Sequence, residues 1–289
     1  MRERSLPHVT VQQLDYLAAV ADADTWAEAA KGLGVTPSAL SQGLAELERR
    51  LGVELFERVG RRRVIAEQSA PVLAYARSVL AQTGDLARWV ERTQSGATGL
   101  LRVGMIDAAA IGHYAHVLRS FRIDRPEVEL TLRVAPSADL LRSLEAGELD
   151  IAVVVRPEER PPGIEWEDVM EEPLAVYAPP GVEAGDPSTW GPWVSFNATS
   201  HTRQLIAKAV TDAGAPFEVV AESNQPDVLR EMVRLGMGWT VLPVIQAESE
   251  PAPLVRARHE PLLTRWLVAA RRAGSVDNPL ADALVSEFS

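Results

Sequence analysis

The first third of the chain carries apolar side chains at the spacing of short helices. A helix is predicted over residues 10–22, and its inward face consists of Val11, Leu14, Leu17, Ala18 and Ala21. Thr25 and Glu28 have the spacing of a capping box, so a second helix starts there, and Gly34 stands where a left-handed residue would end it. The pattern therefore predicts two helices followed by a tight turn.

A third helix follows this turn directly. Thr36 is its expected cap, and Pro37 takes the first position, where a missing N–H costs nothing. Its apolar face consists of Leu40, Leu44, Leu47 and Leu51. Its opposite face is small and polar, and consists of Ser38, Gln42, Ala45 and Arg49, with Ser41 on the flank. Two short helices joined in this way are typical of a helix-turn-helix.

Two further patterns extend this module. Residues 52–65 contain a short apolar run, a turn with three arginines and a β-branched pair, which together predict a two-stranded wing. Between residues 68 and 93 a heptad seam is formed by Val72, Ala76, Val79, Thr83, Leu86 and Val90. An amphipathic helix packed on its own domain would show the same seam. We expect a dimer helix, because the segment leaves a small domain and precedes a Ser-Gly-Ala-Thr-Gly linker at residues 95–99.

From residue 100 onward, strand and helix patterns alternate. Strands are predicted at residues 100–106, 128–134, 151–155, 174–178, 193–196, 219–222, 239–242 and 265–270. Helices are predicted from the alanine-rich stretch to residue 124, and at 138–146, 202–213, 227–235 and 278–288. This order indicates parallel βαβ units, and residues 157–163 resemble a crossover. The expected fold is α/β, with two lobes and crossovers near residues 162 and 264.

Composition and charge limit the classes of function that the protein can have. The chain has 289 residues and a net charge of −11, so binding to nucleic acid has to be local, and Arg58, Arg61, Arg62 and Arg63 supply a basic patch for it. Cysteine is absent, which excludes disulfides, a thiol redox switch and thiolate metal ligands. The first residues lack the apolar core of a signal peptide, and no run has the length of a membrane span. We therefore expect a cytoplasmic protein.

The helix face opposite the leucine stripe could read DNA. Gln42 can pair with adenine, and Ser38 and Ser41 can bond to bases or phosphates. An arginine run suits phosphates or a narrow minor groove. The same polar and basic residues could form nothing more than a solvated surface. The predicted DNA-binding residues are Thr36, Pro37, Ser38, Ser41, Gln42, Arg58, Arg61, Arg62 and Arg63.

The chain resembles the LysR-type transcriptional regulators. The resemblance rests on A-A-x-x-L-x-V-T-x-S-A-L-S-Q from Ala29 and L-E-x-x-L-G-V-x-L-F-E-R from Leu47, and on three later runs that begin at Glu145, Glu172 and Val233. It implies a winged helix-turn-helix, a linker helix that pairs two subunits, and a bilobal effector domain like the type 2 periplasmic binding proteins. Gly43 departs from the pattern, because a large polar or basic residue is common there.

The effector site is expected where strands end and helices begin, since free N–H groups there attract anions. Four stretches of the chain qualify, and the resemblance places the effector pocket at the same positions. The predicted residues are Asp107, Ala108, Ser137, Ala138, Ser200, Thr202, Asn224 and Gln225. The hydroxyl groups could equally serve as helix caps. Asp107 disfavours a simple dicarboxylate as the effector.

The sequence offers residues for two other chemistries, and both chemistries are disfavoured. His113 and His116 have the spacing of metal ligands, but no cysteine or carboxylate pair completes a site, so we expect surface histidines and no metal or cofactor. Ser195, His201 and an aspartate could form a hydrolytic triad, but the Gly-x-Ser-x-Gly elbow is missing, so no enzyme is expected.

The sequence thus predicts a ligand-responsive regulator that binds double-stranded DNA and a small-molecule effector as a homodimer or homotetramer. The expected domains are 1–67, which binds DNA, 68–98, which links and dimerises, and 99–289, which binds the effector. Within the last, one lobe is expected at about 99–161 and 265–289, and the other at about 162–264. The alternative is a small-molecule-binding or enzymatic α/β protein without a DNA-binding role.

Overall fold

The computed structural model describes residues 8–59, 62–95, 99–275 and 278–288, and leaves out the side chains of Val59, Arg62 and residues 91–95. The chain divides into two units. The first comprises residues 1–94 with 145–147, and the second comprises 95–144 with 148–289. The predicted linker at 95–99 lies largely outside the described residues. Among the helices that the structure describes, none is long and apolar enough to cross a membrane.

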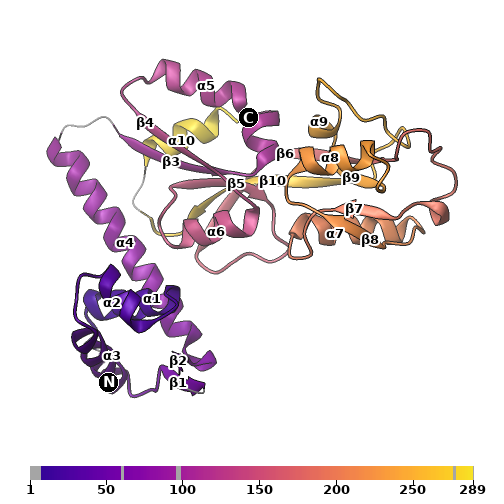
Figure 1. Ribbon diagram of the computed structural model, residues 1–289. Helices are drawn as coiled ribbons and strands as arrows, with labels where there is room; N and C mark the ends of the chain where they lie inside the picture. Colours follow the sequence, from indigo (N-terminus) through magenta and orange to yellow (C-terminus); the bar gives the residue numbers. More distant parts are fainter. Residues whose placement is uncertain (1–7, 60–61, 96–98, 276–277, 289) are drawn as a thin grey trace, which may run out of the picture. The chain divides into compact units, whose positions relative to one another are not determined.

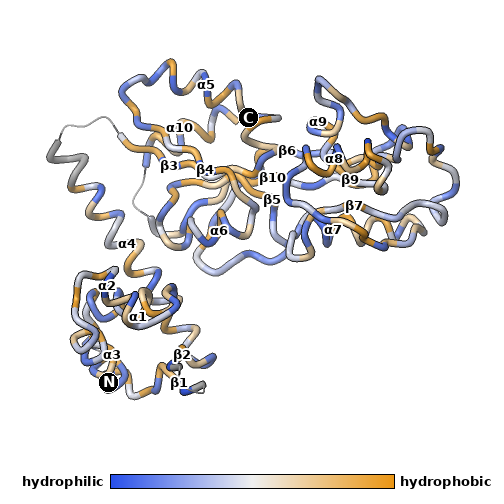
Figure 2. Tube along the Cα trace, viewed as in Figure 1, coloured by the Kyte–Doolittle hydropathy of each residue, from blue (hydrophilic) through white to orange (hydrophobic). Residues whose placement is uncertain are grey.

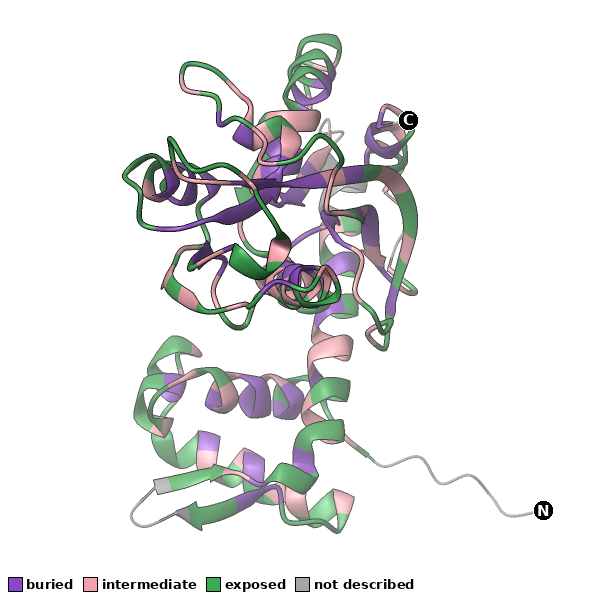
Figure 3. Cartoon of the chain, turned by 90° about the vertical axis from the view of Figure 1, so that its right-hand side faces the viewer, coloured by how far each residue is buried: buried purple, intermediate pink, exposed green. Residues whose placement is uncertain are grey.

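The N-terminal unit is a winged helix-turn-helix followed by a long helix. Its elements are α1 (Val11–Asp22), α2 (Trp26–Gly32), α3 (Pro37–Leu51), β1 (Phe56–Val59), β2 (Arg62–Ile65), a 3-10 turn η1 (Glu67–Ser69) and α4 (Ala70–Ser95). Their core contains Leu17, Leu40, Leu44 and Leu47, all fully buried. The predicted helices and wing are confirmed, and Gly34 is left-handed at φ 68°. Figure 3 shows the wing strands mostly exposed, whereas both buried and exposed residues lie along the helices of this unit.

The prediction that Val11 lies on the inward face of α1 was wrong. Val11 is 45% exposed, and Gln13 is buried in its place. The cause is a capping box at the start of α1: the Thr10 hydroxyl accepts the Gln13 N–H at 3.2 Å, and the Gln13 side chain accepts the Thr10 N–H at 3.1 Å. Reciprocal capping turns Gln13 toward its own helix start and leaves Val11 facing solvent.

Helix α4 has two halves with different surroundings. Val72, Ala76 and Val79 pack into the core of the N-terminal unit, as an ordinary amphipathic helix would. Further along the same seam, Thr83 is exposed and Leu86 is 56% exposed. The heptad pattern therefore serves the domain's own core in its first half and presents apolar surface in its second.

The second unit is built on a six-stranded mixed sheet. Its elements are β3 (Leu100–Met105), a π-helix η2 (Ala108–His113), α5 (Ala115–Asp124), β4 (Glu129–Val134), α6 (Ser137–Glu145), β5 (Ile151–Val155), β6 (Ile164–Tyr177), η3 (Pro187–Thr189), β7 (Trp193–Ser195), α7 (His201–Asp212), β8 (Val219–Glu222), α8 (Pro226–Arg234), β9 (Thr240–Pro243), α9 (Val244–Ala247), β10 (Leu263–Arg272) and α10 (Pro279–Ser286). The strand order is β4-β3-β5-β10-β6-β9, while β7 and β8 form a separate pair. Figure 2 shows hydrophobic residues running through β3, β5 and β10 at its centre.

The parallel βαβ units are present only in part. Strand β3 is parallel to β4 and β5, and β7 is parallel to β8, but β10 runs antiparallel to β5 and β6. Around β3 to β5, helices α5 and α10 cover one face of the sheet and α6 the other (Figure 1). The expectation of parallel units therefore fails for β6, β9 and β10, because β6 runs antiparallel to both β9 and β10.

Two apolar cores divide this unit into lobes. The first core contains Ile164 and Leu267, with Met170 packed against it, and the second begins at Leu174 on β6 and takes in Leu263 on β10. Both strands thus pass from one core to the other in mid-strand. The sequence places the first crossover near residue 162, whereas β6 changes core between Met170 and Leu174 because the strand is continuous through the hinge. On β10 the change of core lies between Leu263 and Leu267.

Candidate nucleic-acid interface and effector site

Helix α3 presents the polar face that the sequence assigned to DNA. Leu40, Leu44 and Leu47 are fully buried, which turns Ser38 and Gln42 outward, while Ser41 is half-buried on the flank. The Thr36 hydroxyl accepts the Ala39 N–H at 3.2 Å, so it caps the helix. Pro37 occupies the first turn and is exposed. The exposed donors and acceptors therefore lie in the N-terminal half of the helix, where recognition helices contact base edges.

The glycine at position 43 of α3, where the family usually has a large polar or basic residue, is explained by packing against α1. A Cβ atom at position 43 would lie 2.7 Å from the ring of Tyr16 on α1, closer than atoms can approach. Gly43 therefore lets the tyrosine ring lie against the helix backbone. The large polar residue that the family pattern would place there has no room beside Tyr16.

The wing arginines differ in their surroundings. Strands β1 and β2 pair antiparallel, with Arg58 opposite Arg63. Arg58 is exposed, Arg61 lies outside the described residues, and the side chain of Arg62 is not described. Arg63 donates from Nη2 to Glu48 Oε2 at 3.0 Å, and its guanidinium lies 5.0 Å from the ring centroids of Trp26 and Phe56. The uniform basic run of the sequence thus contains one arginine that is bound within the domain.

Near the wing, a surface hollow of about 530 Å³ has an acidic lining. It is bounded by Glu54, Phe56, Glu57, Ala66, Glu67 and Gln68. The predicted effector residues are not among these residues, and its three carboxylates make it unsuited to a phosphate backbone.

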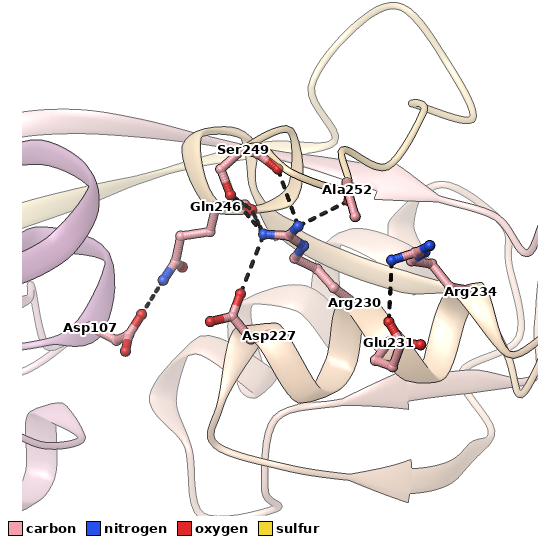
Figure 4. Close-up of polar contacts among 8 residues, drawn as sticks. All are labelled: Asp107, Asp227, Arg230, Glu231, Arg234, Gln246, Ser249 and Ala252. Atoms are coloured by element: carbon pink, nitrogen blue, oxygen red, sulfur yellow. Dashed lines mark hydrogen bonds and ion pairs between the residues drawn. The ribbon is translucent and has the colours of Figure 1, made fainter.

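In the second unit, η2 of the first lobe meets α9 of the second lobe. Gln246 Nε2 donates a hydrogen bond to Asp107 Oδ1 (Figure 4). A Cβ at Gly112 would lie 3.0 Å from Ile245, so this glycine allows the close approach. Burial, and then the charge of Asp227, raise the pKa of Asp107 despite the hydrogen bond from Gln246. Asp107, a predicted effector residue, therefore lies at the junction of the lobes.

Arg230 holds the segment that carries Gln246. The residue is 8% exposed, and its guanidinium donates to the backbone oxygens of Gln246, Ser249 and Ala252 at 2.9, 3.1 and 2.9 Å. It also donates to the Ser249 hydroxyl at 2.6 Å, and Asp227 lies 3.3 Å away (Figure 4). A buried guanidinium needs most of its donors satisfied, and this loop supplies the acceptors.

A second junction of the lobes is a buried polar network. Glu172 on β6 and Arg265 on β10 pair at 2.5 Å, with side chains 1% and 4% exposed. His113 Nε2 lies 2.7 Å from Glu172, and Arg265 donates to the Thr202 hydroxyl at 2.7 Å. Burial alone would raise the pKa of Glu172, but Arg265 and His113 outweigh it and lower that pKa. The network links η2, both hinge strands and the start of α7.

Three of the other predicted effector residues form side-chain hydrogen bonds within the chain. For the rest, the described part of the chain shows no contact that indicates a ligand. The Ser137 hydroxyl accepts the Val155 N–H at 3.1 Å, and the Asn224 side chain accepts the Asn197 N–H at 3.3 Å. Ser200 caps α7 by position, without a side-chain hydrogen bond to that helix. Ala108 is buried, and Ala138 and Gln225 are exposed. Thr202 is buried and belongs to the network around Arg265.

Sequence reasoning missed the residues that join the lobes. Glu172, Arg265, Gln246 and Arg230 were not predicted, and the expectation that His113 is a surface histidine was wrong, because its side chain is 11% exposed beside Glu172. One signal was available for Arg265, because it begins a predicted strand, 265–270, whose other residues are apolar, and such charged residues are rarely buried unless paired. Glu172 follows four other acidic residues and gave no such signal.

The residues considered for metal binding and hydrolysis have the following surroundings in the described part of the chain. His113 faces Glu172 while His116 is exposed, and no three potential metal ligands gather there. His201 Nε2 lies 3.1 Å from the Arg156 carbonyl oxygen, and Ser195 is buried in a strand. These contacts do not make a catalytic triad.

A winged helix-turn-helix with an exposed reading face, followed by a two-lobed α/β domain, defines a ligand-responsive DNA-binding protein. Two family models match the chain, the bacterial regulatory helix-turn-helix protein, lysR family, at residues 11–68 and the LysR substrate binding domain at residues 94–289. The chain therefore belongs to the LysR family of transcriptional regulators.

Relatives and solved structures agree with this. The HTH-type transcriptional regulator CbbR of Xanthobacter flavus is 26% identical over 283 residues, covering 92% of this chain and 83% of CbbR. A full-length OxyR variant of Pseudomonas aeruginosa matches with a TM-score of 0.65 at 22% identity, covering 97% and 95%. Full-length CbnR complexed with its target DNA matches with a TM-score of 0.63 at 20% identity, covering 97% and 99%. The two structures show the shared fold, and the findings together point to a transcriptional regulator.

Proposed function

We propose that this regulator binds its effector where the two lobes meet, and that the bound effector changes the spacing of paired DNA-reading domains. The observation that carries the proposal is the pair of polar junctions between lobes, Gln246 on Asp107 and the network around Glu172. A ligand that fits one arrangement of these junctions better than another would shift the population of lobe arrangements. Only this difference in affinity can transmit a signal.

The DNA-reading part rests on α3 and the wing. Ser38, Ser41 and Gln42 are proposed base and phosphate contacts, with Thr36 and Pro37 at the helix start that approaches the duplex. Arg58, Arg61 and Arg62 are proposed phosphate contacts. The exposed position of Leu86 on α4 supports a homodimer or a homotetramer, because exposed apolar residues on a helix seam favour pairing with a second copy. A homo-oligomer would read two half-sites, and we place it in the cytoplasm.

The effector would combine a neutral or cationic polar group with apolar surface. Asp107 and Asp227 come from opposite lobes, and two carboxylates disfavour a polyanion between them. Ser137, Ser200, Thr202, Asn224 and Gln225 remain the proposed polar contacts, with Ala108 and Ala138 beside them. These assignments follow from the strand ends and helix starts at which the residues lie.

A ligand screen tests the proposal. Purified full-length protein is incubated with a panel of small metabolites, and compounds that raise its unfolding temperature are tested for an effect on binding to a duplex selected from a random pool. Asp107→Asn and Gln246→Ala are expected to reduce the effect of such a compound. Lys208→Ala, at an exposed ion pair on α7, serves as the control. Compounds that act equally on all variants would place the effector away from the lobe junction.

A further inference from the structure

Arg63 has surroundings that a phosphate-binding arginine would not need. Its guanidinium is held by Glu48 of α3 and lies over the rings of Trp26 of α2 and Phe56 of β1. The two rings contact each other edge to face, with centroids 4.9 Å apart at 64°. One side chain of β2 thus touches three other elements of the winged helix-turn-helix.

Glu48 completes the arrangement. Its Oε1 accepts the Leu55 N–H at 2.9 Å, and its Oε2 accepts Nη2 of Arg63 at 3.0 Å. Leu55 immediately precedes β1, and Arg63 lies on β2, so one carboxylate of the recognition helix binds both sides of the wing. The Glu48 side chain is 17% exposed and that of Arg63 is 41% exposed. A solvated surface pair would not combine two such bonds with two ring contacts.

The wing needs an anchor of this kind. Each of its strands has four residues. A two-stranded hairpin of this length is marginally stable by itself in water and requires packing against another element. Phe56 and Leu55 supply the apolar part of that packing, and both are buried. The polar part comes from Glu48 and Arg63.

We propose that Glu48 and Arg63 form a wing anchor, defined as the Glu48–Arg63 ion pair with its contacts to Leu55, Trp26 and Phe56. Both are positioning residues for DNA binding: they set the place of the wing relative to the recognition helix. Arg63 therefore does not act as a phosphate contact, unlike the role proposed for Arg58, Arg61 and Arg62. The inference rests on the DNA-binding function of the family.

The wing anchor predicts that removing the negative charge of Glu48 weakens DNA binding, although the loss of a solvated carboxylate would strengthen it. Removing a carboxylate from a DNA-binding surface reduces repulsion from the phosphates, so a merely solvated Glu48 would give tighter binding when it is replaced by glutamine. The anchor predicts the opposite, because Glu48→Gln leaves Arg63 without its charged partner and loosens the wing. Glu57→Gln is the matched control, since it removes one negative charge from the exposed side of β1.

The experiment measures binding of full-length protein by fluorescence anisotropy, to a duplex selected from a random pool and to a random duplex of equal length. Glu48→Gln is expected to weaken binding to the selected duplex several-fold, while Glu57→Gln binds as tightly as the parent or tighter. Arg63→Lys keeps the charge but loses the planar group that stacks on the rings. It is expected to weaken binding as much as Arg63→Met. The double variant Glu48→Gln, Arg63→Met is expected to bind like Arg63→Met alone.

Hydrogen exchange on the DNA-free protein provides a readout that needs no binding. The amides of β1 and β2 should exchange faster in Glu48→Gln, while those of α1 and α3 stay as protected as in the parent. Parental binding by Glu48→Gln together with parental exchange in the wing would overturn the anchor. So would independent, multiplying effects of the two substitutions. A parent that binds neither duplex would instead contradict the DNA-binding function, and the exchange result would still decide on the anchor.

Discussion

Replacing Arg265 tests whether the buried hinge pair stabilises the effector domain. In Arg265→Met, Glu172 would remain 1% exposed without its ion-pair partner, and the Thr202 hydroxyl would lose its donor. Removing one member of a buried pair typically costs about 3–5 kcal/mol, because an uncompensated charge stays inside. Replacing both members by apolar residues of similar size, as in Glu172→Leu with Arg265→Met, should cost far less for the same reason.

Urea unfolding followed by tryptophan fluorescence measures these costs, since Trp193 and Trp239 are buried in the second core. Glu231→Gln is the control. Its partner Arg234 lies 3.4 Å away, both side chains are about half exposed, and an exposed pair contributes about 0.2–1 kcal/mol. A loss in Arg265→Met no larger than in this control would refute the reasoning.

The pH dependence has a definite sign. The folded-state pKa of Glu172 is lowered from its ordinary value of 4.5, so its pairing stabilises the parent above that value and the contribution is lost as the pH falls further. In Arg265→Met the strongest opposing charge is gone, and burial then raises the pKa of Glu172. The variant takes up a proton earlier and relieves its buried charge. The difference in unfolding free energy between parent and variant should therefore shrink from pH 7 toward pH 4.

Three further predictions concern other parts of the chain. Gln42→Ala should weaken binding to the selected duplex by about 1–3 kcal/mol and leave random-duplex binding unchanged; equal losses on both, measured by anisotropy, would remove Gln42 from base readout. Leu86→Asp should lower the molar mass found by light scattering, because a charge would enter the proposed dimer seam. An unchanged mass would exclude that seam. Val79 is a poorer site for this test, because it packs in the core of its own domain. Ser137→Ala should cost about 1 kcal/mol in urea unfolding, since the Val155 N–H loses its acceptor; no change would mean that the bond contributes nothing.

The N-terminal fold could be predicted because its signals are local. The leucine stripe of α3, the caps at Thr25 and Thr36 and the left-handed Gly34 all lie within a few residues of the structure they specify. The core helices and strands of the second unit were found for the same reason. The predicted helix before residue 124 contains a π-helical start, η2, which the apolar pattern does not distinguish from an α-helix.

The hinge could not be predicted because its partners are distant in sequence. Glu172 and Arg265 are 93 residues apart, and Asp107 and Gln246 are 139 apart. The first half of β6, from Ile164 to Glu172, has adjacent charged and adjacent apolar residues that break the alternation of a strand, and it pairs with β10 across a register shift. The sequence pattern also assigned DNA contacts to all three arginines of the wing turn. The surroundings of Arg63, however, depend on Trp26 and Glu48, which belong to other elements.

The central claim is that the chain recognises a DNA sequence through α3 and the wing of a paired molecule. Repeated selection of duplexes from a random pool by the full-length protein tests it most directly. We expect an enriched sequence with two related half-sites, bound roughly 10³-fold or more tighter than random duplex, with affinity that falls steeply as salt rises. A pool without an enriched sequence, bound no better after selection than before, would contradict the account.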